Sequence, residues 1–341
     1  MIFDGQSPQA IDAAAQALQR GDLLGLPTET VYGLAADAGN DAAVAKIFAA
    51  KGRPADHPLI VHVASAQAVQ HFASQVPVFA QKLIDAFWPG PLTLILPRRP
   101  EVAAVAAGGQ NSVGLRCPSH PIAQAVLRNA ETLGVDGVAA PSANVFGRVS
   151  PTTAAHVAGE FGDDLLILDG GACEVGIEST IVDCTRAVPV LLRPGVLTPE
   201  QLSEACGVVV ITPHAPDADA PRASGTLASH YAPTAQVRLM SAADLQQAVD
   251  TYGHDAPEHA TLVGLVAVWS RSPVRILEAH TAQIHWQPMP QVASDCAHQL
   301  FAQLRDFDAA GVAQIWVEIP PLSPAWDGVL DRLTRAATPT R

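Results

Sequence analysis

The sequence predicts an α/β protein of two domains joined by a long linker, and three observations support this prediction. The chain has 341 residues, which is more than a single domain usually holds. Short apolar runs alternate with segments of helical periodicity on both sides of an aperiodic stretch over residues 212–233. With 48% hydrophobic and 16% charged residues, the composition is that of a compact globular protein. We therefore expect domains over residues 1–211 and 236–341, with the linker at 212–235.

The first domain is expected to alternate strands with helices. Asn40 can cap a helix that ends near Gly52, and Thr198 opens a capping box with Pro199 at the first helical position. The predicted strands cover residues 23–26, 59–63, 92–96, 112–116, 138–140, 165–168, 180–182 and 188–192, and the predicted helices cover residues 11–20, 41–50, 121–129, 153–161 and 199–206. Gly33 is expected to permit a sharp turn after the polar segment 27–32.

The linker contains several prolines and small residues and shows no periodicity. A loop of this length is usually either disordered or functional, so we predict a mobile lid over a reaction site, with a passive spacer as the alternative. A second, smaller α/β domain follows the linker. Its predicted strands cover residues 237–240, 262–268, 274–277 and 315–318, and its predicted helices cover residues 241–252, 292–307 and 326–337.

Charge and cysteine content exclude several classes of protein. The formal net charge is −13 and both halves of the chain are acidic, whereas a general nucleic-acid-binding protein normally has a basic face. The five cysteines have neither zinc-site nor redox-motif spacing, which indicates reduced thiols in a cytosolic protein. The N-terminus lacks the pattern of a signal peptide, and no apolar run is long enough for a membrane span.

Two cations stand close together after the helix predicted over residues 41–50. Lys51 supplies a point charge and Arg53 a planar group that can donate parallel hydrogen bonds, so the pair suits an anionic ligand such as a polyphosphate. We expect both on the loop after the helix. The structural alternative is a solvated helix end, where the helix dipole favours cations in any case.

Other polar residues follow strands or precede helices, where α/β proteins gather ligand groups. Ser142 and Asn144 follow the strand predicted over residues 138–140. Ser150 precedes Pro151 and is expected to cap the next helix, whose free amides could also accept a phosphate.

For Arg193, two histidines and Tyr231, the sequence permits either a functional or a structural role. Arg193 ends a strand and is either a ligand cation or part of a surface ion pair of small energy. His57 and His62, taken alone, are more often structural than functional. Tyr231 closes the linker and could pack on a nucleotide base or anchor the second domain.

Taken together, these segments resemble the threonylcarbamoyl-AMP synthase family in its long form, which has a YrdC-like domain followed by a second domain. The matching motifs are Pro-Thr-Glu-Thr-Val-Tyr-Gly-Leu at 27–34, Lys-Gly-Arg-Pro at 51–54, Pro-Leu at 58–59, Ser-Ala-Asn at 142–144, Gly147 with Ser-Pro-Thr at 150–152, Ser-Thr-Ile-Val-Asp at 179–183, Arg-Pro-Gly at 193–195 and His-Tyr-Ala-Pro at 230–233. Each motif is weak alone, but the ordered set is specific. The P-loop, the G-x-S-x-G elbow and the H-E-x-x-H helix are missing from the sequence.

The resemblance implies a YrdC-like twisted mixed sheet with helices and a smaller Rossmann-like α/β domain. It implies a cytoplasmic nucleotidyltransferase that makes threonylcarbamoyl-AMP from L-threonine, bicarbonate or CO2, and ATP, with release of pyrophosphate. The product would pass to a separate transferase that modifies tRNA, so little direct tRNA binding is expected. Mg²⁺ would be bound through ATP, without direct protein ligands.

The same resemblance assigns the site residues. ATP contacts are implied for Lys51, Arg53, His57, Ser112, Ser142, Asn144, Ser150, Arg193 and Tyr231, and contacts to threonine or its carbamate for Thr30, His62, Arg116, Ser179 and Thr180. Lys51 and Arg53 take the catalytic role, since charge develops on the phosphates in such a reaction. The linker departs from the family pattern, because Ser224-Gly225-Thr226 replaces basic residues, so a linker cation on the phosphates is not expected.

Two other functions fit a YrdC-like domain. One is an RNA-binding module with a concave basic cavity, which the acidic charge of both halves disfavours. The other is a carbamoyltransferase domain that uses carbamoyl adenylate, but the larger proteins with that activity have zinc-finger and acylphosphatase-like segments that this chain lacks. ATP-dependent release of pyrophosphate distinguishes the synthase from both.

Overall fold

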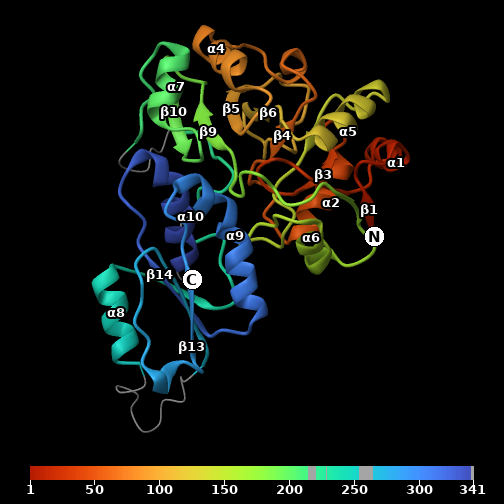
Figure 1. Cartoon of the computed structure of the whole chain (residues 1–341). Helices are drawn as coiled ribbons and strands as arrows, with labels where there is room; N and C mark the ends of the chain where they lie inside the picture. The colour runs from red at the N-terminus through yellow and green to blue at the C-terminus, as the bar shows by residue number, and fades with distance from the viewer. Residues whose placement is uncertain (214–219, 228, 253–263, 339–341) are drawn as a thin grey trace. The chain divides into compact units, whose positions relative to one another are not determined.

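The computed structural model describes residues 1–213, 220–227, 229–252 and 264–338, and it divides into two compact units (Figure 1). Unit 1 comprises Met1–Phe146 and Ser150–Thr226, and unit 2 comprises Gly147–Val149 and Leu227–Arg341. The change of unit after Thr226 falls inside the predicted linker, whose residues 214–219 and 228 lie outside the described residues. None of the described helices is long and apolar enough to cross a membrane.

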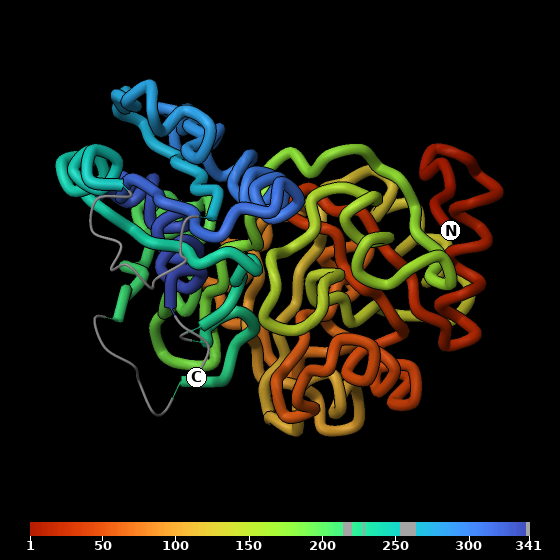
Figure 2. Tube along the Cα trace, turned by 90° about the horizontal axis from the view of Figure 1, so that it is seen from below, coloured from red at the N-terminus to blue at the C-terminus, as the bar shows by residue number. Residues whose placement is uncertain are grey.

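Unit 1 is built on a mixed sheet with the strand order β1-β8-β2-β3-β7-β4-β6-β5-β9-β10, which confirms the predicted class of fold. The strands are β1 (Ile2–Asp4), β2 (Leu24–Leu26), β3 (Gly33–Asp37), β4 (Ile60–His62), β5 (Leu92–Pro97), β6 (Ser112–Arg116), β7 (Val138–Ala139), β8 (Leu166–Asp169), β9 (Thr180–Asp183) and β10 (Val190–Arg193). In the middle of the sheet, β4 runs parallel to β6, while β5 is antiparallel to β6 and parallel to β9. The N-terminal segment lies at one edge of unit 1 in Figure 2, as its outermost strand β1 requires.

Helices cover both faces of this sheet (Figure 1). They are α1 (Pro8–Gln19), α2 (Asp41–Lys51), α3 (Val69–Phe72), α4 (Val78–Phe87), α5 (Pro121–Thr132), α6 (Ala154–Phe161) and α7 (Pro199–Cys206). One core contains side chains of α1 and α5, and the other contains side chains of α2, α4, α6 and α7. Strand β3 separates the two cores, because Ala35 belongs to the first and its neighbours Leu34 and Ala36 to the second.

The predicted helix ends are largely confirmed. The Asn40 side chain accepts the Ala43 N–H, α2 ends at Gly52 with φ 61°, and both hydrogen bonds of the Thr198 capping box are present. The predicted cap at Ser150 is wrong, because α6 begins one turn later and is capped by Thr153. Lys51 was expected on a loop but is the last residue of α2, and its side chain is buried.

Strand β3 was missed, and the expected turn at Gly33 is wrong. Gly33 is the first residue of β3 and pairs with Leu26 of β2. A Cβ atom at this position would lie 3.1 Å from the Ala140 Cβ atom, so the glycine serves close packing between strands. The alanines of β3 give no β-propensity signal, since they fit a strand only because both faces of the sheet are covered. Helices α3 and α4 and strand β1 were also missed.

Unit 2 contains a smaller, entirely parallel sheet with the order β11-β14-β12-β13. Its elements are β11 (Gln236–Met240), α8 (Ala242–Asp250), β12 (Val266–Ser270), η1 (Glu278–His280), β13 (Ile284–Pro288), α9 (Ala293–Ala309), β14 (Gln314–Glu318), η2 (Pro324–Trp326) and α10 (Asp327–Ala337). The strand predicted over residues 274–277 is wrong, because the strand lies at β13. Val274 and Ile276 pack on the core beside α8 without pairing in the sheet. Because every second side chain is apolar, the segment has the alternating pattern of a strand.

The segment Gly147–Val149 is tied to unit 2 by backbone and side-chain contacts. The Ala232 N–H donates to the Gly147 carbonyl at 2.9 Å, and Arg148 forms a parallel bridge with Ala232. The Arg148 Nη2 atom donates to Thr234 Oγ1 at 2.8 Å, and Asp308 accepts the Thr234 N–H at 2.7 Å. These contacts explain why a segment expected in the first domain groups with the second.

Candidate active site

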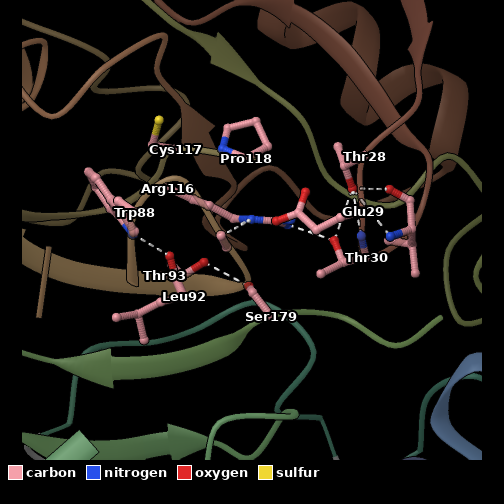
Figure 3. Close-up of polar contacts among 12 residues, drawn as sticks. Thr28, Glu29, Thr30, Trp88, Leu92, Thr93, Arg116, Cys117, Pro118 and Ser179 are labelled. Carbon is pink, nitrogen blue, oxygen red and sulfur yellow. Dashed lines mark hydrogen bonds and ion pairs between the residues drawn. The ribbon is translucent and has the colours of Figure 1, made fainter. Parts of the chain in front are cut away.

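Arg116, at the end of β6, is the centre of a buried polar cluster (Figure 3). Its Nη2 atom lies 2.7 Å from Glu29 Oε1, its Nη1 atom donates to Thr30 Oγ1 at 2.7 Å, and its Nε atom donates to the Gly90 carbonyl at 3.3 Å. The Thr30 hydroxyl is also 2.9 Å from that of Thr28. These contacts fix the plane of the guanidinium, and the group has more N–H bonds than they use, so it can still hold a carboxylate.

His62, at the end of β4, lies beside Arg116. The two residues are register partners in the parallel β4–β6 pair, so their side chains project from the same face of the sheet. Burial, reinforced by the positive charge of Arg116, lowers the pKa of His62 to about 3, which keeps the imidazole neutral. Its Nδ1 atom is buried and has no hydrogen-bond partner among the described residues. A neutral imidazole has one donor and one acceptor nitrogen, so it suits a hydroxyl or amino group of a ligand.

Glu29 was not among the predicted site residues, although it stands in the middle of the motif over residues 27–34. Burial alone would raise its pKa, but the charge and hydrogen bond of Arg116, together with the backbone N–H groups of Glu29 and Ser119, hold the pKa below its usual value. The carboxylate is therefore ionised in a buried ion pair. Its position in the motif was the available signal.

Arg193, at the end of β10, holds a second part of the site. Its Nε and Nη2 atoms donate to the Ser179 carbonyl at 3.1 Å and 2.9 Å, and Nη1 donates to the Ser224 carbonyl at 2.9 Å. The Ser179 hydroxyl is 2.8 Å from that of Thr93, and Figure 3 shows this pair in the same view as Arg116. Arg193 is 2% exposed, so the alternative of a surface ion pair is wrong.

Thr180 and Ser112 take different positions in the same unit. The Thr180 hydroxyl accepts the Leu197 N–H at 3.3 Å, so it fixes the turn after β10. Ser112 lines a small pocket with Thr93 and Ser224, among others. Ser112 thus lies near the contacts of Arg193, while the described contact of Thr180 is to the backbone.

Lys51 and Arg53 lie together at the end of α2. The Lys51 Nζ atom donates to the Ser142 carbonyl at 2.6 Å and also to the Asn144 carbonyl. Burial, with the nearby charge of Arg53, lowers the pKa of Lys51 to about 7. The alternative of a solvated helix end is wrong for Lys51, because its side chain is buried and bound to the loop that holds Ser142 and Asn144.

Ser224, in the described part of the linker, joins two of the cations. Its hydroxyl accepts a hydrogen bond from Arg53 Nη2 at 3.3 Å and donates to the Pro58 carbonyl at 2.7 Å, while its carbonyl is bound by Arg193. Arg222, two residues earlier, forms an ion pair with Asp56 at 2.8 Å. Two arginines that the sequence assigns to ATP phosphates are therefore brought together in unit 1, with Ser224 between them.

An aromatic ring lies beside these cations. The guanidinium of Arg53 lies over the Phe146 ring at 5.6 Å, and the His57 ring is 5.6 Å from the same ring. Burial, reinforced by Arg53, lowers the pKa of His57. Sequence reasoning missed Phe146, which follows the Ser-Ala-Asn motif by two residues.

Ser150 and Tyr231 occupy separate surroundings. The Ser150 hydroxyl donates to Glu178 Oε1 at 2.5 Å, and both side chains are buried in unit 1. Tyr231 belongs to unit 2, is 1% exposed, and packs 5.3 Å from the Phe301 ring, with Arg332 over its face at 5.5 Å. Its contact with a nucleotide stays a prediction.

The geometry of unit 1 provides two kinds of subsite. Glu29, Thr30, His62 and Arg116 form one that fits a small ligand with a carboxylate and further polar groups. Lys51, Arg53 and Arg193 form another that fits an extended anion. Among the described residues, no group of three or more His, Cys, Asp or Glu side chains could hold a metal ion.

Comparison with known proteins gives matches along the whole chain. Residues 16–195 match the family model Sua5_yciO_yrdC, described as "Telomere recombination", and residues 197–338 match the model of the threonylcarbamoyl-AMP synthase C-terminal domain. The threonylcarbamoyl-AMP synthase of Pyrococcus abyssi is 37% identical over 96% of this chain and 94% of its own length, and that of Bacillus subtilis is 36% identical over 97% and 93%.

A solved structure agrees with these matches. Sua5 of Pyrococcus abyssi in complex with L-threonine superposes with a TM-score of 0.87 at 35% identity, covering 99% of this chain and 97% of that one. Both domains are therefore matched in sequence and in fold. The chain belongs to the threonylcarbamoyl-AMP synthase family in its two-domain form.

Proposed function

We propose that this chain synthesises threonylcarbamoyl-AMP from L-threonine, bicarbonate or CO2, and ATP, and releases pyrophosphate. The relatives that match nearly its full length have the name of this synthase, and one of them was solved with L-threonine. The observation that supports the proposal most directly is the Arg116 cluster. It places a cation with unused N–H bonds beside the neutral imidazole of His62, as an amino acid with a hydroxyl side chain would require.

The reaction needs positioning more than a covalent nucleophile. The amino nitrogen of threonine bonds to the carbon of CO2 and loses a proton, which gives a carbamate. A carbamate oxygen then bonds to the α-phosphorus of ATP, and the bond from that phosphorus to the bridging oxygen breaks to release pyrophosphate. In this proposal Arg116 binds the threonine carboxylate. His62 accepts a hydrogen bond from the side-chain hydroxyl, and no proton is transferred.

The cations neutralise charge on ATP. Lys51, Arg53 and Arg193 are proposed to contact the phosphates, where they stabilise the charge that develops as pyrophosphate leaves. The phosphates would then replace the Ser224 contacts of Arg53 and Arg193. Mg²⁺ bound to the phosphates would supply further charge neutralisation and bring no ligand from the protein.

The remaining predicted residues orient the two substrates in this proposal. They are His57, Ser112, Ser142, Asn144, Ser150 and Tyr231 toward ATP, and Thr30, Ser179 and Thr180 toward threonine or its carbamate. Phe146 adds a ring near His57 on which a base could stack.

The test is release of pyrophosphate from ATP by the full chain, with L-threonine and bicarbonate omitted in turn. We expect release only with both present, and a product with the mass of threonylcarbamoyl-AMP. Release with carbamoyl phosphate in place of threonine and bicarbonate would favour the carbamoyltransferase alternative. RNA binding without any release of pyrophosphate would favour the RNA-binding alternative.

The product is proposed to serve a separate transferase that modifies tRNA in the cytoplasm. Labelled threonine should therefore enter tRNA only when that transferase is added. Incorporation by this chain alone would contradict the proposal that a separate transferase modifies the tRNA. The acidic charge of the chain agrees with little direct tRNA binding.

A further inference from the structure

The ion pair between Glu29 and Arg116 lies inside the proposed threonine subsite, yet Glu29 has no part in the function proposed so far. Both side chains are almost completely buried, at 4% and 5% exposure. Figure 3 shows one carboxylate oxygen of Glu29 directed at the guanidinium and the other turned away from it. The second oxygen, Oε2, is buried and receives no hydrogen bond from a described side chain, while the backbone N–H groups of Glu29 and Ser119 stabilise the carboxylate as a whole.

Among the described residues, Arg116 is the one charge that shifts the pKa of Glu29. The titratable groups whose pKa responds to Glu29 or Arg116 are His62, Cys117 and Cys173. Burial lowers the pKa of His62 to about 3, raises that of the Cys117 thiol, and raises that of the Cys173 thiol to about 12. All three are therefore neutral near pH 7, and the carboxylate and guanidinium balance only each other.

A buried, balanced pair restricts the charge of the ligand that it accepts. A ligand with only a carboxylate would bind Arg116 but leave one negative charge uncompensated, and burying an unpaired charge is strongly unfavourable. An amino acid brings an ammonium group beside its carboxylate, so each charge of the ligand meets an opposite charge of the pair. Oε2, to which no described side chain donates a hydrogen bond, is the acceptor that such an ammonium group needs.

We propose that Glu29 is a specificity-determining residue, which selects ligands that have an α-amino group by accepting that group on Oε2 while Arg116 binds the carboxylate. This inference rests on the proposed function, since it takes the Arg116 cluster to be the threonine subsite. The structural alternative is that Glu29 only holds Arg116 in place. The two roles differ in one respect: holding Arg116 affects every carboxylate ligand alike, whereas selection affects only ligands with the amine.

The experiment measures binding of two ligands to the full chain by calorimetry. One is L-threonine, and the other is (R)-3-hydroxybutyrate, which is threonine without its amino group. In Glu29→Gln we expect the affinity for L-threonine to fall by about 10- to 100-fold, the range for loss of a charge-assisted contact. The affinity for (R)-3-hydroxybutyrate should stay the same or increase, because the uncompensated negative charge is gone.

Two further variants keep the test falsifiable if Glu29→Gln folds poorly. Glu29→Asp retains the charge, so the preference for L-threonine over the deaminated acid should survive even if both bind more weakly. Asp183→Asn is the matched control, because Asp183 is also a fully buried carboxylate with an arginine partner, Arg186, at 2.9 Å. It should lower the unfolding temperature without changing the ratio of the two affinities.

The outcomes separate this inference from the proposed function. A loss of the preference for L-threonine in Glu29→Gln, with the preference kept in Glu29→Asp, supports it. Equal weakening of both ligands, or an unchanged ratio, overturns it and leaves the synthase proposal intact. Failure of the unmodified chain to bind L-threonine at all would overturn both.

Discussion

Each unit of the molecule buries an arginine, and the two side chains differ in what surrounds them. Arg332 of unit 2 is 0% exposed, pairs with its chain neighbour Asp331 at 2.9 Å, and lies over the ring of Tyr231. Arg116 of unit 1 is held by groups from separate loops, beside the open Nδ1 atom of His62. Burial of an arginine therefore does not by itself indicate a site. What distinguishes Arg116 is the carboxylate of Glu29 and the neutral imidazole of His62 that lie around it.

Replacing each arginine by lysine tests this contrast, and it gives the largest expected effect. Arg116→Lys should lower kcat/KM for L-threonine by about 10²- to 10³-fold, because a point charge cannot contact Glu29, Thr30 and a carboxylate together. Arg332→Lys should keep kcat/KM within a few-fold of the unmodified chain. Pyrophosphate release at varied threonine concentration measures both. Equal losses in the two variants would remove the distinction.

Arg53 extends the contrast to the anion subsite. Arg53→Ala should reduce the rate of pyrophosphate release by about 10²-fold, since a cation that stabilises developing phosphoryl charge is lost. Arg222→Ala is the control, because the ion pair of Arg222 with Asp56 is exposed, at 50% and 63% of the side chains. Near-normal turnover of Arg53→Ala would refute the assignment of Arg53 to the phosphates.

Arg332→Met tests whether Arg332 contributes to the stability of unit 2 and not to threonine binding. The change removes one of two arginine partners of Asp331, which keeps Arg335 at 2.8 Å, and it takes the cation from the face of Tyr231. The free energy of unfolding of unit 2 should therefore fall by about 2 kcal/mol. Tryptophan fluorescence during a urea titration reports mainly on unit 2, because Trp269, Trp286, Trp316 and Trp326 all lie there. Threonine affinity should not change; a clear loss would mean that Arg332 also serves the site.

The smallest expected effect concerns Lys51, and it is the number of protons taken up when ATP binds. Its pKa of about 7 in the free protein leaves the amine mostly neutral at pH 8, and bound phosphates would raise the pKa again. ATP binding should therefore take up protons between pH 7 and the ordinary lysine value of about 10.4. Calorimetry in two buffers of different ionisation enthalpy measures this uptake. It should vanish in Lys51→Arg, whose side chain stays charged, and uptake that persists there would assign the proton to another group.

Much of the fold follows from local signals in the sequence. Strands such as β5 and β6 and helices such as α2 and α7 were predicted because apolar runs and capping residues agree. Strand β3 and the strand at β13 were not, because their positions depend on neighbouring strands that the local sequence does not specify. The alternating run over residues 274–277 shows the same limit, since it packs on the core of unit 2 without joining the sheet.

The sequence was sufficient to predict most residues of the site, but it did not predict how those residues are arranged in space. The motifs indicated Lys51, Arg53, Arg116 and Arg193, but only the strand order shows that β6 brings Arg116 beside His62. Glu29 was passed over because a glutamate between two threonines on a loop gives no sign of burial. Phe146 was passed over because a lone aromatic after a polar motif is usually core packing.

The short segment Gly147–Val149 has a consequence for how the chain assembles as it is made. This segment emerges from the ribosome before strands β8, β9 and β10, whereas its partners Ala232 and Asp308 come only after all of unit 1. A protein truncated after Thr226 would keep the segment but lack every one of these partners. The first unit should therefore leave a three-residue loop unsecured during synthesis until the second unit is complete, and a single cut cannot divide the gene into two self-sufficient pieces.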